Sequence, residues 1–308
     1  MTDAGPPLSR STLDRAGHRR IDDEWLAKAW PDARLLVVDV RAGKALVRDA
    51  YPPELVVLGT EGADPRSALF LGVEPDGVAV FAVADELPAV LDARPAGLRE
   101  VGALLSERDA GLLVTALALA SWHARHPYSA LTGLPTTVRD AGWSRVDAAG
   151  NQGWPRTDPA MIVLVHDGAA GPDGRCLLGN NTTWPKEPGV RRFSCLAGYV
   201  EPGESAEAAV VREVAEEVGI SLIRVDYVAS QPWPFPGSLM LGFSAVADPR
   251  APVRVDGEEI TMARWFTRRE IAAVLAGEVV EPVPGAGERT TLPMSASIAH
   301  YLLTRWLG

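Results

Sequence analysis

The stretch that decides the fold is GYVEPGESAEAAVVREVAEEVGI, residues 198–220. Gly198 opens an acidic loop rich in glycine, and Glu204 stands just before a run of helix-forming residues. Ser205 is suited to cap that helix, because a serine oxygen accepts hydrogen bonds from the free N–H groups of the first turn. Gly219 stands where a glycine commonly ends a helix. The stretch therefore predicts a loop that leads directly into a helix.

Three carboxylates of this helix face the same way. At about 100° per residue, Glu213, Glu216 and Glu217 fall within an arc of about 100°, beside an apolar stripe that includes Val210 and Val214. Like charges this close raise each other's pKa unless a cation lies among them. Carboxylate oxygens on a rigid element suit Mg2+ or Mn2+, so we expect a divalent metal site. The alternative, a solvated acidic face, leaves the flanking glycines and arginine unexplained.

Composition sets the class of protein. A chain of 308 residues is long enough for about two domains. No apolar run reaches the roughly 20 residues that span a bilayer, and the first residues lack the apolar core of a signal peptide. The two cysteines, Cys176 and Cys195, give no disulfide framework. We expect a cytoplasmic protein without membrane contact, and the net charge of −10 argues against a large nonspecific nucleic-acid surface.

The texture of the sequence changes twice along the chain. Residues 1–125 combine short β-branched runs with helical periodicity after Pro95, which predicts a small α+β domain without a catalytic constellation. Residues 126–156 form a connector rich in glycine and proline. Residues 157–308 predict an α/β/α sandwich with a mixed sheet, in which residues 221–232 form a pair of strands and helices cover about 268–276 and 294–306. The fold class is α+β.

A second motif, SQPWPFPGS at residues 230–238, follows the helix. Its prolines fix φ and remove backbone donors, so the segment is stiff and is neither a helix nor an interior strand. Because the segment is stiff, Trp233 and Phe235 would lose little conformational entropy on binding a ligand. Such aromatic side chains suit stacking on a flat ring. The alternative is a packing loop or a dimer contact.

Both motifs match a known family. Residues 198–220 resemble the Nudix box, G-x5-E-x7-R-E-U-x-E-E-x-G-U, in which U is a bulky aliphatic residue. Residues 230–238 resemble the signature of the NADH pyrophosphatase branch of the Nudix hydrolases. The resemblance covers 126–308 well and the N-terminal domain only in outline. It implies a Nudix fold, Mg2+ or Mn2+, a homodimer, and cleavage of NAD(H) to AMP and NMN(H); some members also remove NAD caps from RNA.

The resemblance also implies roles for single residues. The metal ligands it implies are Glu213, Glu216, Glu217, Glu259 and the carbonyl of Ala197. Glu258 is the alternative to its neighbour Glu259 as a metal ligand. We expect Glu204 and Arg212 to form an ion pair that holds the loop. The attacking water is activated by metal alone or with Glu216 or Glu217 as the base, and the sequence leaves these alternatives open.

Substrate contacts follow in the same way. Tyr199 matches an aromatic residue that stacks on a base of the dinucleotide; its alternative is core packing. Gln231 and Ser238 bind the nucleotide or shape the loop, and Ala299 matches a backbone contact to the base. Trp233 and Phe235 complete this set, from the same chain or from a dimer partner.

The connector departs from the family pattern. The placing of its glycine and proline residues resembles that of a zinc ribbon, whose structural zinc needs four thiolates. The matching places hold Ser129, Thr132, Asp147 and roughly Ala149, and none is a cysteine. We therefore expect no zinc, and a ribbon remnant held by the packing of three aromatic residues, Tyr128, Trp143 and Trp154.

Several functions compete. The first is an NAD(H) pyrophosphatase, with NAD-capped RNA as a further substrate. The second is a Nudix hydrolase of another nucleoside diphosphate such as ADP-ribose. The third is an NAD-binding regulator that has lost catalysis. The complete set of carboxylates argues against this third function. A ribbon that binds RNA is the weakest, because the cysteines are absent and the chain is acidic.

Overall fold

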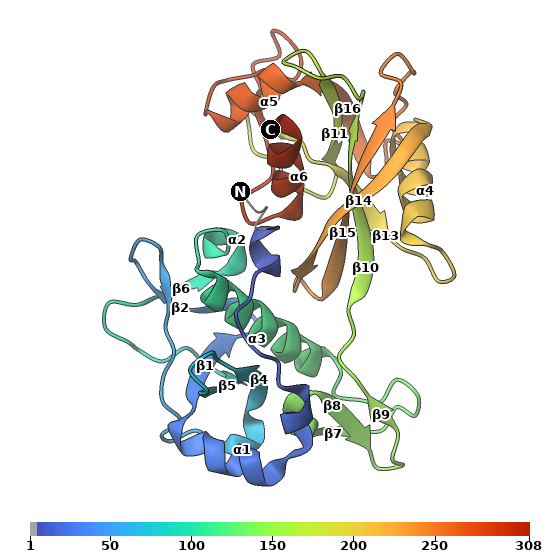
Figure 1. Ribbon diagram of the computed structural model, residues 1–308. Helices are drawn as coiled ribbons and strands as arrows, with labels where there is room; N and C mark the ends of the chain where they lie inside the picture. Colours follow the sequence, from blue (N-terminus) through green and yellow to red (C-terminus); the bar gives the residue numbers. More distant parts are fainter. Residues whose placement is uncertain (1–4) are drawn as a thin grey trace. The chain divides into compact units, whose positions relative to one another are not determined.

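The computed structural model describes residues 5–308. The chain divides into two compact units, whose helices and strands are labelled along the ribbon in Figure 1. The first holds the chain up to Thr157 together with Pro232–Ser238, and the second holds Asp158–Gln231 and Leu239–Gly308. Each unit has its own sheet and its own hydrophobic cores.

The sheet of the first unit is mixed. Its strands are β1 (Arg34–Asp39), β2 (Lys44–Arg48), β3 (Glu54–Leu55), β4 (Leu69–Val73), β5 (Ala79–Ala84) and β6 (Arg94–Gly97). They run in the order β3-β2-β1-β5-β4, and β6 pairs with β2. β1 is parallel to β5, whereas the β1–β2 and β4–β5 pairs are antiparallel. Apolar residues on both faces require a helix on each side.

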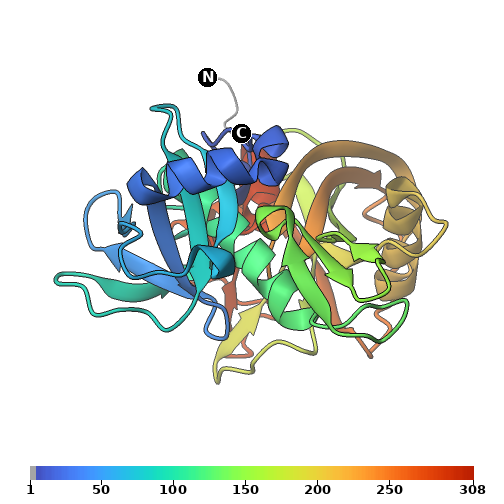
Figure 2. The ribbon, with the colours of Figure 1, turned by 90° about the horizontal axis from the view of Figure 1, so that it is seen from below.

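Helices cover both faces of this sheet. They are α1 (Asp23–Ala29), α2 (Leu98–Val101) and α3 (Glu107–Arg125), with short 3-10 turns at Pro7–Ser9, Gly17–Ile21, Trp30–Asp32, Pro65–Ser67 and Asp140–Gly142. α3 packs on the face that carries Leu36 and Val38. Residues of α1 pack on the other face, where Trp25 meets Phe70 edge to face. Figures 1 and 2 show α1 and α3 on opposite sides of the strands. The expected α+β unit is confirmed.

The connector folds as a small antiparallel sheet of its own. Its strands are β7 (Thr136–Arg139), β8 (Ser144–Asp147) and β9 (Gln152–Gly153). The places where a ribbon would carry thiolates meet at the carboxylate of Asp147. That carboxylate accepts from the Thr132 hydroxyl at 2.6 Å and from the Ala149 N–H at 2.9 Å. The Asn151 backbone and amide and the Ser129 side chain add further hydrogen bonds. We call this cluster the Asp147 knot.

The aromatic residues hold the connector less than expected. Tyr128 and Trp154 are 62% and 64% exposed, so the prediction that they pack the remnant is wrong. Trp143 does pack: its indole N–H donates to the Phe70 carbonyl at 2.7 Å, and the Arg20 guanidinium lies 3.4 Å from its ring centroid. The connector is therefore held mainly by the hydrogen bonds of the Asp147 knot, and less by the packing of aromatic side chains.

The second unit is built on a second mixed sheet. Its strands are β10 (Asp158–His166), β11 (Arg175–Asn181), β13 (Leu196–Tyr199), β14 (Leu222–Trp233), β15 (Ser238–Ala247) and β16 (Ile260–Thr267). The order is β14-β15-β10-β11-β16, with β13 paired to β10, and β12 (Val190–Arg192) pairs in parallel with β17 (Arg289–Thr291). The expected strand pair over 221–232 is wrong: one strand runs through, because no turn residue interrupts it. β14 lies at the end of the strand order, where Pro232 is tolerated.

Helices sandwich this sheet as well. They are α4 (Ala206–Val218), α5 (Arg268–Leu275) and α6 (Ile298–Leu307). Val210, Val214 and Val218 of α4 are fully buried on one face of the sheet. Ile271 of α5 and Leu303 of α6 are buried on the other. Each buried aliphatic side chain contributes about 1.5–3 kcal/mol, so α4 is firmly anchored while its remaining surface is available for chemistry. The α/β/α sandwich is confirmed.

Within residues 5–308 there is no helix with the length and apolar character that a bilayer crossing requires.

Candidate active site

The loop and helix of residues 198–220 form as their sequence predicts. The Ser205 hydroxyl accepts from the Ala208 N–H at 3.1 Å and caps α4. Gly219 ends the helix at φ 68°, and its N–H donates to the Ala215 carbonyl at 3.0 Å. This φ favours glycine, because a Cβ strains the left-handed conformation. Both ends of α4 are therefore fixed by local chemistry.

An arginine on α4 holds the loop. The Arg212 guanidinium donates to both oxygens of Glu204, at 2.8 and 2.9 Å, and to the Tyr199 carbonyl at 3.0 Å. The second Glu204 oxygen also accepts from the Glu201 N–H at 3.0 Å. The hydrogen bonds from Arg212, followed by that backbone contact, lower the pKa of Glu204 to about 2. Glu204 and Arg212 thus form the ion pair expected from the sequence, and it joins the loop to the helix.

The same guanidinium also reaches two of the clustered carboxylates. Its Nη1 atom lies 2.9 Å from Glu213 Oε1 and 3.1 Å from Glu216 Oε2. Glu216 is otherwise open to solvent, with a side chain that is 60% exposed. One positive nitrogen therefore lies between these two carboxylates, in the position that a bound cation would also favour.

The backbone of β13 lies directly against α4. A Cβ added to Gly198 would lie 1.9 Å from Glu213 Oε1, so only glycine leaves room for that carboxylate. The neighbouring residue, Ala197, pairs with Ile162 of β10 and makes a backbone hydrogen bond to Glu217. Pairing with β10 thus fixes the strand end against which Glu213 and Glu217 lie.

Glu217 is the most unusual group of the site. It is 3% exposed, and its Oε2 atom has no hydrogen-bond partner among the residues that the structure describes. Burial raises its pKa to about 8, and the charges of Glu213, Glu259 and Asp256 add to the effect. Burial also raises the pKa of Glu213, although Arg212 opposes this. Among the described residues, Glu217 therefore lacks the positive partner that Glu213 and Glu216 find in Arg212.

A second loop brings Glu259 to this cluster. The Asp256 N–H donates to the Glu217 carbonyl at 3.3 Å, next to the C-terminus of α4. The Asp256 carboxylate then accepts from the N–H groups of Glu259 and Ile260, at 3.1 and 2.9 Å. Thr182 donates to the Glu259 carbonyl at 2.8 Å. Sequence reasoning missed Asp256; its signal is the Asp256-Gly257 turn, which folds the loop back onto the helix.

The donor set suits a hard cation. Over residues 5–308, no three His, Cys, Asp or Glu side chains are gathered closely enough to hold a metal, and Glu213 and Glu216 both contact Arg212. The buried and unpartnered Glu217 oxygen nevertheless needs positive charge. Carboxylate oxygens, here on a helix and on a neighbouring loop, are the ligands that Mg2+ and Mn2+ prefer. Glu213, Glu216, Glu217 and Glu259 are the residues that would hold such an ion.

Four of the predicted substrate-binding residues lie in different settings. Tyr199 ends β13 and is 57% exposed, so it is not packed in a core. Gln231 is fully buried and its amide donates to the Ala296 carbonyl at 3.1 Å, which shapes the segment before α6. Ser238 is buried at the start of β15. Ala299 lies in the first turn of α6, where backbone N–H groups lack helical partners.

Trp233 and Phe235 fall in the first unit. Both pack against its hydrophobic core, and their rings meet at 5.1 Å between centroids. The Arg99 guanidinium lies 4.7 Å from the Phe235 centroid and 5.5 Å from that of Trp233. These contacts are those of a packing loop, the alternative weighed above, and stacking on a substrate ring stays a prediction.

Comparison with known proteins assigns both units. Residues 156–282 match the model of the NUDIX domain, and residues 29–122 match that of the NADH pyrophosphatase-like rudimentary NUDIX domain. The chain is 42% identical to the NAD-capped RNA hydrolase NudC of Mycobacterium bovis (strain BCG / Pasteur 1173P2) over 98% of this chain and 94% of that protein. The same figures hold for NudC of Mycobacterium tuberculosis (strain H37Rv).

A human relative is more distant. The NAD-capped RNA hydrolase NUDT12 of Homo sapiens is 38% identical over 66% of this chain and 43% of that protein. The mycobacterial matches extend over both units, as do the two domain models taken together. The loop, the helix and the carboxylates are those of a Nudix hydrolase, an enzyme class that generally uses divalent metals such as Mg2+ or Mn2+. The chain belongs to the NudC-like NADH pyrophosphatase family of Nudix hydrolases.

Proposed function

We propose that the protein hydrolyses the pyrophosphate bond of NAD(H) to AMP and NMN(H), with removal of NAD caps from RNA as the same reaction on a longer substrate. The observation that carries the proposal is the buried Glu217 carboxylate, unpartnered at Oε2 and crowded by Glu213 and Glu259. A binding protein gains nothing from this arrangement, whereas hydrolysis of an anionic substrate needs it. The names of the relatives support the substrate.

The reaction adds water across one P–O–P linkage. Water oxygen bonds to one phosphorus, the bridging oxygen leaves with the other phosphate, and the proton of the water is taken up by a base. A divalent metal, when bound, neutralises phosphoryl charge and lowers the pKa of a water ligand. Its proposed ligands are Glu213, Glu216, Glu217, Glu259 and the carbonyl of Ala197.

The chain's own residues position these groups. Arg212 and Glu204 fix the loop, and Gly198 lets the Glu213 carboxylate lie against the strand. Of the two candidate bases, Glu217 is buried at 3% exposure, whereas the Glu216 side chain is 60% exposed. We assign proton uptake to Glu217, the buried one of the two, because a metal ion held beside it would keep it ionised.

The remaining assignments extend the proposal. Exposed Tyr199 stacks on a base of the dinucleotide, and the Ala299 N–H in the first turn of α6 contacts it. Mg2+ or Mn2+ is the cofactor, the functional unit is a homodimer, and the protein works in the cytoplasm. Free and buried Cys176 and Cys195 suit a reducing compartment.

The test is AMP release from NADH with Mn2+, measured for the parent protein and Glu217→Gln. The matched control is Glu207→Gln, which removes an exposed carboxylate from the first turn of the same helix. We expect a loss of about a hundredfold or more for E217Q and little change for E207Q. ADP-ribose and NAD-capped RNA at equal concentration form parallel arms. Weak NADH cleavage beside rapid ADP-ribose cleavage would reassign the substrate, and inactivity on all three would overturn hydrolysis.

A further inference from the structure

A cavity of about 670 Å3 lies in the first unit, and its lining contains none of the residues assigned above to catalysis. Its walls are residues 40–44 between β1 and β2, residues 97–100 at the start of α2, the second half of α3 and Pro234–Pro236. Figure 1 shows β2, β6, α2 and α3 side by side in this unit. The volume is within the range of about 300–1,000 Å3 typical of small-molecule sites.

The rim of the cavity is cationic. Arg41, Lys44, Arg99 and Arg125 line it, and all four are exposed. Throughout the described part of the chain, no carboxylate pairs with any of them. The single acidic residue in the lining, Glu100, is held by Arg94 at 2.6 Å. Four cations without a carboxylate partner around one cavity are unexpected in a chain with a net charge of −10. These cations repel one another unless an anion binds between them.

The floor of the cavity is apolar and partly aromatic. Leu98 and Leu117 are buried beneath it, and Phe235 contributes its ring. Arg99 lies 4.7 Å from that ring centroid, so its guanidinium is positioned without a carboxylate. Gly43, at φ 65°, takes the left-handed conformation that the β1–β2 turn requires, and the place of its missing Cβ lies at an ordinary contact distance of 3.6 Å from the Phe235 ring. The ring therefore forms a fixed wall below the cationic rim.

We propose that this cavity binds a phosphorylated nucleoside, either as a free nucleotide or as one nucleotide of an RNA chain. Guanidinium and ammonium groups bind phosphate oxygens, and the apolar floor suits the flat ring of a base. The first unit thereby acquires a binding site of its own, beyond the proposed hydrolysis. Both sources share this chemistry, and the experiment separates them.

The experiment measures binding in EDTA, where cleavage is absent. A 5′-labelled, uncapped RNA of about ten nucleotides is titrated by fluorescence anisotropy, and AMP by calorimetry, each at about 50 mM salt. The test variant is Arg41→Gln/Lys44→Gln. The matched control is Lys28→Gln/Arg139→Gln, which removes two exposed, unpaired cations of the same unit outside the cavity. Arg125→Gln is a second test variant, and circular dichroism confirms that each is folded.

We expect the test variant to bind about tenfold more weakly or worse, with a shallower salt dependence, and the control to stay within about twofold of the parent. Loss of RNA binding alone identifies the polynucleotide as the source, and loss of AMP binding identifies the free nucleotide. Equal losses in test and control variants, or no binding of either ligand by the parent, would overturn the proposal. NADH cleavage by the parent decides the proposed function separately, so either can fail alone.

Discussion

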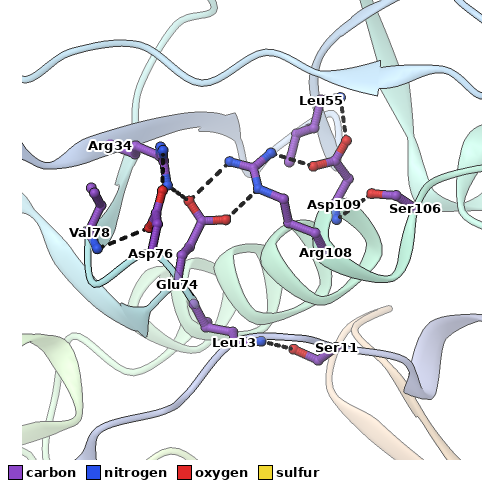
Figure 3. Close-up of polar contacts among 10 residues, drawn as sticks. All are labelled: Ser11, Leu13, Arg34, Leu55, Glu74, Asp76, Val78, Ser106, Arg108 and Asp109. Atoms are coloured by element: carbon purple, nitrogen blue, oxygen red, sulfur yellow. Dashed lines mark hydrogen bonds and ion pairs between the residues drawn. The ribbon is translucent and has the colours of Figure 1, made fainter.

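The two units each bury a carboxylate to a similar depth, but they treat its charge in opposite ways. Glu74 of the first unit is 5% exposed and Glu217 of the second is 3% exposed. Figure 3 shows Glu74 between Arg34 and Arg108, each of which makes an ion pair with it. Burial favours the neutral form of Glu74, but hydrogen bonds from Arg108 and Arg34 outweigh it and lower the pKa.

The surrounding charges complete the contrast. Arg34 also pairs with Asp76 at 2.7 Å, and Arg108 with Asp109 at 2.7 Å, so that three carboxylates and two guanidinium groups alternate in one row (Figure 3). Around Glu217 the neighbouring charges that shift its pKa are all negative, and that pKa rises to about 8. Burial of a carboxylate is therefore not what marks the active site. The mark of the candidate site is a buried carboxyl group beside which the described residues place no compensating positive charge.

The largest effect should appear in turnover. Glu217→Gln removes the uncompensated group, and AMP release from NADH should fall by about a hundredfold or more. Glu74→Gln removes the compensated one, and turnover per folded molecule should stay within a few-fold of the parent. Initial rates with Mn2+, normalised to folded protein by circular dichroism, make the measurement. Comparable losses of turnover in both variants would erase the distinction between the two units.

Stability should reverse that order. Glu74→Gln leaves two guanidinium groups short of their shared partner, and we expect a loss of about 2–3 kcal/mol in the free energy of unfolding. The arginines are about one-third exposed and keep Asp76 and Asp109, which limits the loss. Urea titration at pH 7 in EDTA gives the value. A variant as stable as the parent would show that the network of Figure 3 contributes nothing net.

The pH dependence of stability should differ in sign between the two carboxylates. The folded pKa of Glu217 is about 8, above its ordinary value of 4.5, so its contribution is present below pH 4.5 and is lost as pH rises through 8. For Glu74, whose pKa is lowered, the contribution is present above pH 4.5 and is lost as pH falls.

Urea midpoints in EDTA at pH 5.5 and 8.5 measure the Glu217 contribution. The parent should lose on the order of 3 kcal/mol between these values, and Glu217→Gln should lose less. If parent and variant lose the same amount, the raised pKa of Glu217 does not govern this window.

The smallest effect should come from metal addition. An ion that binds the folded state stabilises it by RT ln(1 + [L]/Kd), or about 1.4 kcal/mol at ten times Kd. Mn2+ should raise the melting temperature of the parent by a few degrees, and that of Glu217→Gln by less. Glu74→Gln is the control and should respond to Mn2+ as the parent does. An equal response in E217Q would place the ion elsewhere.

Local sequence rules predicted the helix of the site well. Ser205, Gly219 and the Glu204–Arg212 pair act over a few residues, and each is found as expected. Contacts between distant segments were not predictable in this way. Arg34, Glu74 and Arg108 meet across 34 and 40 residues of chain, and Asp256 reaches the end of α4 from a separate loop.

Single-residue chemistry also misjudged some aromatic residues. Tyr128 and Trp154 were expected to pack the connector, yet they lie in solvent. A bulky aromatic ring indicates packing only if the fold places an apolar surface beside it, and the sequence of a short sheet does not reveal whether it does. Trp143 finds such a surface next to Phe70, more than seventy residues away in the chain.

The Asp147 knot has a consequence for how this protein tolerates its surroundings. A ribbon closed by thiolates loses its fold when zinc is withdrawn, and its sulfurs are open to oxidation. Here the hydrogen bonds from Thr132, followed by those of Asn151 and Ser129, hold the pKa of Asp147 well below its usual range. We therefore expect the knot to stay ionised and closed through chelation, peroxide or mild acid. Metal starvation should stop the chemistry of the second unit while leaving the connector intact.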